Sequence, residues 1–476
     1  MDNGVATEPS TGFPAISSRA NEAAAPGEDD SRHVQALCGE IARLIVLIDA
    51  RIGEQLDLIL HHPRFQALES LWRGVAWLSG NMAGDSQLKL RILDLRWAEL
   101  ERDIERAAMF DQTILFEMVY NGEFGRPGGE PFGLLVVDHQ VSHHPDPRGP
   151  DDITVLGGLA EVAAAAFCPV VVGADPRILG LDGYDELDLR QDAGDTFRTA
   201  EYSRFNKLRS EPDARFLACA LPRLLMRRPH RSRSFPRLGI RYDERIDDHR
   251  HLLWGSAAFG LASVAARAMR LHRWPANIRG AVAPNDGGIV DGPERLFLES
   301  DKPGVVARFP TEAAVSQSQE VELNQLGLTA LRQCHLTGSA AFFNVPSLHQ
   351  PPSYDSEMAR LNARLSANLH YVLCVSRFAH YVKVIAREWI GRFRTADEAR
   401  RLLENWIQEY VTTTEDASHE QRARYPLGEA SIDVSERPDA PGSFEATVLL
   451  RPHFQLDHIS PEFALTTPIG HDVEQG

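Results

Sequence analysis

The chain has 476 residues, and 67 Asp and Glu against 50 Lys and Arg give it a formal net charge of −17 at pH 7. Hydrophobic residues make up 43% and charged residues 25%, which excludes a fibrous or disordered protein and indicates about two to three globular domains. The acidic balance argues against nucleic-acid binding, and no apolar run reaches the roughly 18 residues of a membrane-spanning helix. The start of the sequence lacks signal-peptide character, so we expect a cytoplasmic protein without direct membrane insertion.

The cysteines do not form a recognisable metal or disulfide pattern. There are five, an odd number, scattered without CxxC spacing and flanked mainly by apolar residues. This pattern is typical of small buried hydrophobic side chains in a reducing compartment. The residues concerned are Cys38, Cys168, Cys219, Cys334 and Cys374.

A long amphipathic helix is predicted near the N-terminus. Residues 1–30 are rich in Ala, Gly, Pro, Ser and acidic residues without apolar periodicity, which predicts a flexible tail. Ser31 is a plausible N-cap, and His62-Pro63 would end the helix. Its apolar stripe either packs on the core of the chain or binds a partner. The stripe includes Leu37, Ile41, Leu44, Ile48 and Ile52.

The next segments predict one β-α-β unit. Helical spacing in 64–78 is followed by the alternating segment 88–95, which predicts a half-buried strand, and by further helical spacing in 98–118. After the glycine-rich loop 125–133, the apolar run 132–137, the helical pattern 153–167 and the apolar run 169–173 indicate strand, helix and strand. We therefore expect a partly parallel sheet.

A basic island interrupts the acidic chain at 222–250, where nine arginines stand against four acidic residues. It is either a solvated loop or a patch that meets an acidic partner surface.

The C-terminal part predicts two helices and a hairpin. Residues 365–390 form a strong helical pattern, with Ser376, His380, Lys383 and Arg387 on its polar side. A helix at 396–410 follows, then strands at 430–436 and 444–450 joined by a Pro- and Gly-containing turn, and an extended segment near 462–467.

No catalytic constellation is convincing. Asp138 and Asp175 follow predicted strands, where α/β enzymes often place functional carboxylates, and His139 lies beside Asp138. A metal-assisted hydrolase that uses Asp138, His139 and Asp175 is therefore the alternative hypothesis, although the nearby histidines lie in a proline-rich loop. The glycine run precedes a strand and so does not suit a phosphate cradle, and neither GxSxG nor HExxH occurs.

The sequence also resembles a known family, the large sheath subunits of bacterial type VI secretion systems (TssC/VipB/EvpB type). The matching stretches occur in the expected order between about residues 35 and 460. They are EQLDLILHHPRFQALESLWRG (54–74), GGEPFGLL (128–135), LLWG (252–255), IRG (278–280), FPTE (309–312), AAFF (340–343), ARLS (363–366), VSRFAHYVKVI (375–385) and LRPHFQL (450–456).

This resemblance implies a structural role without catalysis or cofactor. Such subunits pair with a small sheath subunit (TssB/VipA type) and polymerise into a helical sheath around a tube of hexameric rings on a baseplate. Contraction propels the tube, and a ClpV-type AAA+ unfoldase then dismantles the sheath.

The resemblance also implies an α/β (α+β) multi-domain fold. We expect a flexible tail (1–30), an N-terminal helix (31–61), a sheath core with a mixed sheet (62–362) and a gpW/gp25-like domain of two helices and a small sheet (363–476). Strands donated between subunits augment that small sheet in the family. Our candidates for this sheet are Phe444, Thr447, Leu449, Phe454 and Leu456, and the candidate unfoldase or partner helix carries Leu37, Ile41, Leu44, Ile48 and Ile52.

Overall fold

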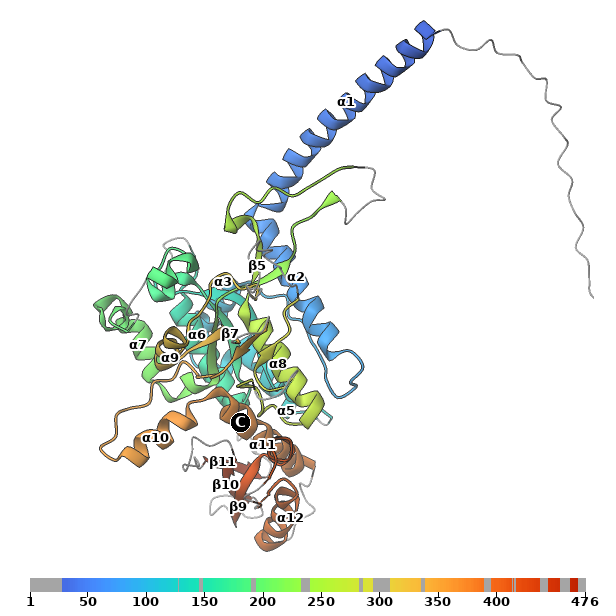
Figure 1. The fold of residues 1–476 in the computed structure, drawn as a ribbon. Helices are drawn as coiled ribbons and strands as arrows, with labels where there is room; N and C mark the ends of the chain where they lie inside the picture. The colour runs from blue at the N-terminus through green and yellow to red at the C-terminus, as the bar shows by residue number, and fades with distance from the viewer. Residues whose placement is uncertain are drawn as a thin grey trace, which may run out of the picture. The chain divides into compact units, whose positions relative to one another are not determined.

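The computed structural model describes residues 28–126, 128–144, 149–189, 194–232, 240–281, 286–293, 309–334, 339–388, 395–412, 414, 417–436, 444–453 and 463–469 (Figure 1). The helices are α1 (Glu28–Leu60), α2 (Pro63–Met82), α3 (Trp97–Arg106), α4 (Ile114–Phe116), α5 (Gly122–Phe124), α6 (Asp152–Ala166), α7 (Ser203–Ser210), α8 (Ala257–His272), α9 (Gln317–Gln325), α10 (Glu357–Ser366), α11 (Leu369–Glu388), α12 (Ala396–Gln408) and α13 (His419–Arg424). The strands are β1 (Leu135–Val141), β2 (Val170–Ala174), β3 (Leu217–Leu221), β4 (Leu224–Arg227), β5 (Leu253–Gly255), β6 (Ile289–Val290), β7 (Leu328–Gln333), β8 (Ala340–Phe342), β9 (Leu427–Glu436), β10 (Phe444–Pro452) and β11 (Phe463–Ile469).

The chain divides into two compact units. The smaller unit combines residues 1–59 with His230–Glu244, and the larger one combines Leu60–Pro229 with Arg245–Gly476. The predicted N-terminal helix is confirmed as α1, and the next helix begins where the sequence indicated. His62 adopts the extended conformation of an N-cap and Pro63 takes the first helical position, where its missing N–H costs nothing.

A six-stranded sheet forms the centre of the larger unit, in the order β1-β2-β3-β7-β8-β6. Strands β1, β2, β3 and β7 are parallel, and β8 and β6 continue the sheet in antiparallel pairing. The β-α-β unit is confirmed as β1, α6 and β2. Every residue of β2 and β3 is buried, as expected for parallel strands covered on both faces.

Helices cover both faces of this sheet. Helix α6 packs on one face, where its Leu156 shares a core with Val170 of β2 and Leu217 of β3. Helix α8 packs on the other face with Val171, Ala218 and Ala220. Because consecutive strand residues point to opposite faces, Val170 and Val171 belong to different cores.

Two local predictions are wrong. The alternating segment 88–95 does not form a strand within the described structure, because no other strand pairs with it. Residues 98–118 form helix α3 followed by short helical turns instead of one helix. Helix α3 ends at Arg106, where Ala107 adopts an extended conformation, and Asp103 accepts hydrogen bonds from the backbone N–H groups of Ile114 and Leu115 through its two carboxylate oxygens.

The C-terminal part folds as predicted into helices and a small sheet. Helices α11 and α12 pack on a three-stranded antiparallel sheet in the order β11-β10-β9. The hairpin prediction is confirmed by the pairing of Val434 with Ala446 and Ile432 with Val448 in β9 and β10. The extended segment predicted near 462–467 is β11.

The predicted polar side of α11 is not a solvent face. Ser376 and His380 are buried, and the ring Nε2 of His380 lies 3.0 Å from the backbone oxygen of Ala166. Further along the helix, Lys383 Nζ lies 3.3 Å from Tyr120 Oη, and Arg387 donates to three backbone carbonyls of residues 123–126. These side chains dock α11 on the central sheet domain, which explains why a core-facing helix carries them.

The basic island is partly structural. Arg223 makes a bidentate contact with Glu312 at 2.5 and 2.6 Å, and the buried Arg227 lies 2.8 Å from Glu69. These arginines therefore cross-link distant segments of the larger unit and are not a free surface patch. Residues 233–239 of the island lie outside the described part of the chain.

Candidate assembly surfaces

The residues of the hydrolase hypothesis do not form one site. The Nε2 of His139 lies 2.8 Å from Asp152 Oδ1, and its ring stacks on Trp97. Asp175 accepts hydrogen bonds from Arg177. Asp138 lies three residues before Val141, which pairs with Ala174, so Asp138 and Asp175 are separated by roughly 10 Å of strand. Burial raises the pKa of Asp138 to about 6, although part of its side chain is exposed.

The described residues also hold no group of three His, Cys, Asp or Glu side chains placed to bind a metal ion. The glycine-rich loop lies before β1, where its residues make local contacts. Glu123 accepts a hydrogen bond from the backbone N–H of Glu130, and Gly129 donates to the backbone oxygen of Arg126. The hydrolase hypothesis therefore has no support from the geometry.

Helix α1 exposes the apolar stripe that the sequence predicted. Leu37 is 62% exposed, and Ile41, Leu44 and Ile48 are between 49% and 57% exposed, while Ile52 is half-buried. Within the smaller unit, residues 240–244 contact the polar side of the helix, where Tyr242 Oη donates to Asp57 at 2.6 Å and the Arg241 amide donates to Asp49. Within the smaller unit, the described residues therefore leave Leu37, Ile41, Leu44 and Ile48 uncovered.

The cysteines of the larger unit are buried, whereas the cysteine of α1 is exposed. Cys168, Cys219, Cys334 and Cys374 are buried, as predicted, and burial raises the thiol pKa of Cys168 and Cys219 well above its ordinary value. Cys38 on α1 is exposed, so the prediction of a buried thiol is wrong there. The apolar sequence around Cys38 therefore does not mark a buried position.

The small C-terminal sheet places its candidate residues on the middle strand. Phe444, Thr447 and Leu449 lie in β10, which pairs with β9 on one side and with β11 on the other. Phe454 and Leu456 lie outside the described residues. An added strand cannot pair with β10 because both edges of that strand are already used, so an addition to this sheet must use β9 or β11.

Among the described residues, no strand pairs with the outer edge of β9 beyond its first residue. The segment 410–412 covers only its first residue, through hydrogen bonds between Tyr410 and Leu427 and between Thr412 and Leu427. Further along, Gln408 Nε2 donates to the backbone oxygen of Ala430 at 3.2 Å. This indicates that Ala430 directs its carbonyl away from β10. In an antiparallel ladder the alternate residues Ile432 and Val434 then direct their amides to the same free edge.

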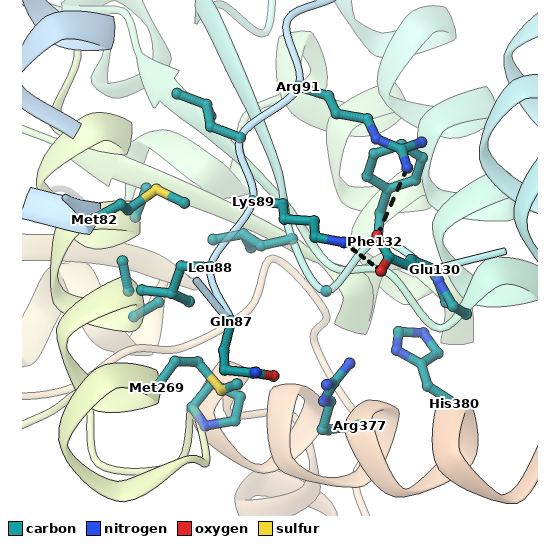
Figure 2. A pocket seen from close by; sticks show the side chains of 18 of the residues that line it. Met82, Gln87, Leu88, Lys89, Arg91, Glu130, Phe132, Met269, Arg377 and His380 are labelled. Carbon is teal, nitrogen blue, oxygen red and sulfur yellow. Dashed lines mark hydrogen bonds and ion pairs between the residues drawn. The ribbon is translucent and has the colours of Figure 1, made fainter. Parts of the chain in front are cut away.

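A cavity of about 540 Å³ lies between the extended segment after α2, the loop before β1, and helices α8 and α11. Figure 2 shows Arg377 and His380 extending from α11 into it, with Lys89, Arg91 and Glu130 on the opposite side. Lys89 forms an ion pair with Glu130, and Arg91 forms one with Glu123. Arg377 lies over the ring of Tyr381, 4.4 Å from its centroid, and its buried Nε has no hydrogen-bond partner.

Comparison with known proteins identifies the family. The family described as EvpB/VC_A0108, tail sheath N-terminal domain, matches residues 42–349, and the EvpB/VC_A0108 tail sheath gpW/gp25-like domain matches residues 358–469. The chain is 35% identical over 434 residues to the type VI secretion system sheath protein TssC1 of Pseudomonas aeruginosa, covering 90% of this chain and 86% of that protein. The chain belongs to the TssC/VipB/EvpB family of type VI secretion sheath proteins.

The family match agrees with the fold. The central sheet domain corresponds to the sheath N-terminal domain, and α11, α12 and the three-stranded sheet correspond to the gpW/gp25-like domain. A solved structure of an anti-feeding prophage baseplate covers 76% of each chain at 11% identity, and its TM-score of 0.33 is too low to support an argument. None of the helices in the described ranges has the length and apolar character needed to cross a membrane.

Sequence reasoning missed several features of this sheath protein. It did not predict β3, although the continuous apolar run LACAL at 217–221 has the length and composition of a buried parallel strand. It also missed the docking role of Lys383 and Arg387 and the free edge of β9. No local signal identifies an open edge, because that depends on which strands pair.

Proposed function

We propose that this chain is the large subunit of a cytoplasmic contractile sheath in a bacterial type VI secretion system. It pairs with a small sheath subunit, and the pairs polymerise on a baseplate around an inner tube and contract to propel the tube. The 35% identity to TssC1 over nearly the whole chain carries this proposal. The division into segments 1–30, 31–61, 62–362 and 363–476 belongs to the same proposal, as does the absence of a catalytic role.

The exposed stripe of α1 supports assembly with another protein. Full burial of a large aliphatic side chain is worth roughly 1.5–3 kcal/mol, and the half-exposed side chains of this helix forgo part of that gain. Helix binding in an apolar groove recovers this energy. We therefore propose that the surface of Leu37, Ile41, Leu44, Ile48 and Ile52 is covered in the assembled sheath and becomes available to a ClpV-type unfoldase after contraction.

The small C-terminal sheet supports the second contact. We propose that a strand from a neighbouring subunit adds to the sheet that contains Phe444, Thr447 and Leu449, with β9 as the receiving edge. Main-chain hydrogen bonds of this kind keep subunits connected while they slide and rotate. Because β10 is the middle strand, Leu449→Pro would break the subunit's own ladder as well as assembly, and a substitution on β9 is the more selective test.

Val434→Pro tests the receiving edge. We expect it to remove the outward amide of β9 and prevent sheath formation while the complex with the small subunit still forms, because the ladder to β10 uses the neighbouring residues. Val434→Ala is the matched control, since it shortens the same side chain and keeps the amide. The measurement is negative-stain electron microscopy of the purified complex. Normal sheaths from the proline variant would contradict the placement on β9.

The whole proposal is tested by co-expression with a small sheath subunit of the same organism. We expect a stable complex that assembles into hollow tubes visible by electron microscopy, and a much lower soluble yield of the chain when it is expressed alone. A soluble monomer that does not respond to the small subunit would contradict the proposal.

A further inference from the structure

The extended segment 88–95 has the sequence of a strand but no strand partner. Its residues alternate between apolar and polar in the first half, LKLR, yet no β-bridge reaches it within the described structure. Leu90, Ile92, Leu93 and Leu95 are between 40% and 60% exposed. An unpaired backbone with exposed aliphatic side chains on both faces is the condition under which strand addition gains both hydrogen bonds and apolar burial.

The segment is held in place at both ends. Lys89 pairs with Glu130, and Arg91 lies over the ring of Phe132 at 5.1 Å, just before β1. Beyond the other end, Trp97 stacks on His139 in the second half of β1, with ring centroids 4.3 Å apart. These contacts fix Lys89, Arg91 and Trp97 against residues 130–139, so less backbone entropy remains to be lost when a strand pairs with the residues between them.

Strand β1 is a poorer receiving edge, although it is the outer strand of the sheet. Its register with β2 is interrupted between Val136 and Gln140, where four steps along β1 match the two steps from Val171 to Gly173. Such an irregularity disrupts the regular spacing of backbone N–H and C=O groups, and edge strands use it to avoid pairing with a further strand. Residues 88–95 are therefore the better receiving backbone in this region.

The cavity beside the segment indicates what the added strand carries. Apolar residues from α8 and α11 form its walls, so it accepts an aliphatic or aromatic side chain. Lys89 and Arg91 already have the carboxylates of Glu130 and Glu123, whereas Arg377 makes no ion pair with a carboxylate in the described part of the chain. A strand with alternating apolar residues and one acidic residue near Arg377 fits this surface.

We propose that residues 88–95 receive a β-strand of the small sheath subunit, with an apolar side chain of that strand in the adjacent cavity and a carboxylate on Arg377. This inference rests on the proposed function, because it names the surface by which the proposed partner binds.

Hydrogen exchange measured by mass spectrometry tests the pairing. The chain is compared alone and in complex with the small sheath subunit. We expect the amides of residues 88–95 to exchange at least about 10-fold more slowly in the complex. Unchanged exchange in a complex that forms normally would overturn this inference and leave the proposed function standing. If the unmodified chain forms no complex, the proposed function fails and this inference fails with it.

Two adjacent proline variants give a sharper test. Successive amides of a strand point to opposite edges, so Ile92→Pro and Leu93→Pro remove N–H groups from different sides. We expect one of them to weaken binding of the small subunit at least about 10-fold and the other to change it less than about 2-fold. Ile92→Val is the control that keeps the amide. If both proline variants bound the small subunit with the same affinity, strand pairing would be contradicted. The same conclusion would follow if both lost affinity equally and also unfolded at a lower temperature.

Arg377 tests the chemistry of the partner strand. We expect Arg377→Gln to weaken binding of the small subunit about 10-fold and Arg377→Lys to recover part of that loss, because a cation remains opposite the carboxylate. Unchanged binding by Arg377→Gln would overturn the assignment of an acidic residue. Protection of residues 88–95 in the absence of the small subunit would point to a second copy of this chain and overturn the assigned occupant.

Discussion

Helices α6 and α1 both carry a dense set of aliphatic residues, but only α6 buries them. Nine residues of α6 are buried between the sheet and the preceding helical turns, whereas no residue of α1 between 31 and 60 reaches that level of burial. The apolar periodicity of a sequence shows which face of a helix avoids water. It does not show whether the covering surface belongs to the same chain.

The same contrast separates β2 from the segment 88–95. Both contain several aliphatic residues, and every residue of β2 is buried, while Ile92 is 60% exposed. Strand β2 has partners on both sides within this chain, and residues 88–95 have none among the described strands. In a sheath protein, the elements without internal partners are the ones that we expect to meet other subunits.

Substitution in α6 should give the largest effect. Leu156→Asp places a carboxylate where the side chain is fully buried, which costs at least about 5 kcal/mol. This cost reaches the whole free energy of unfolding of a marginally stable domain. We expect no folded protein, even with the small subunit present, as measured by soluble yield and thermal unfolding. An unfolding transition close to that of the unmodified chain would contradict the account of the core.

The matched substitution on α1 should leave the fold intact. Leu44 is 49% exposed, so Leu44→Asp should change the unfolding temperature of the isolated chain by no more than about 2 °C. We expect about 100-fold weaker association with the small subunit or loss of sheaths, because the carboxylate would be buried in the contact. Unchanged assembly would show that this stripe is not covered, and a lost fold would show that it packs within the chain.

The docking of α11 should depend on pH. Burial, together with the nearby cations Arg377 and Lys383, lowers the pKa of His380 to about 4. As the pH falls, His380 binds a proton near pH 6.5 in the unfolded chain but only near pH 4 in the folded protein. Its contribution to the free energy of unfolding is therefore largest above pH 6.5 and is lost as the pH falls toward 4. For this residue the loss between pH 7.5 and 5 is about 2 kcal/mol.

Denaturant unfolding at the two pH values measures this loss. His380→Gln is the control, since its amide can donate to the backbone oxygen of Ala166 and does not titrate. The difference between the two proteins isolates His380 from other buried histidines. An identical pH dependence in both proteins would show that His380 does not contribute.

The sequence predicts elements that are completed by local or neighbouring residues. The β-α-β unit, helices α11 and α12 and the β9-β10 hairpin follow from periodicity and turn residues, and all are present. The family resemblance, carried by short dispersed motifs, is confirmed by the two domain matches.

The remaining features depend on contacts that periodicity does not encode. Lys383 and His380 have the spacing of a solvent face, but backbone oxygens and aromatic rings from the central domain surround them. The arginines of the basic island look like a patch, yet Arg227 pairs with Glu69, which lies 158 residues earlier. Residues 88–95 alternate like a strand, but alternation identifies a suitable backbone and not the strand that pairs with it.

Labelling of Cys38 tests the central claim most directly. Cys38 lies one helical turn from Ile41 and is exposed, while the other four cysteines are buried. We expect a maleimide to modify one thiol per isolated chain and to modify Cys38 at least about 10-fold more slowly once the chain is assembled with the small subunit, because the apolar face of α1 is then covered. Equal labelling in the isolated chain and in well-formed sheaths would contradict the claim that α1 is an assembly surface.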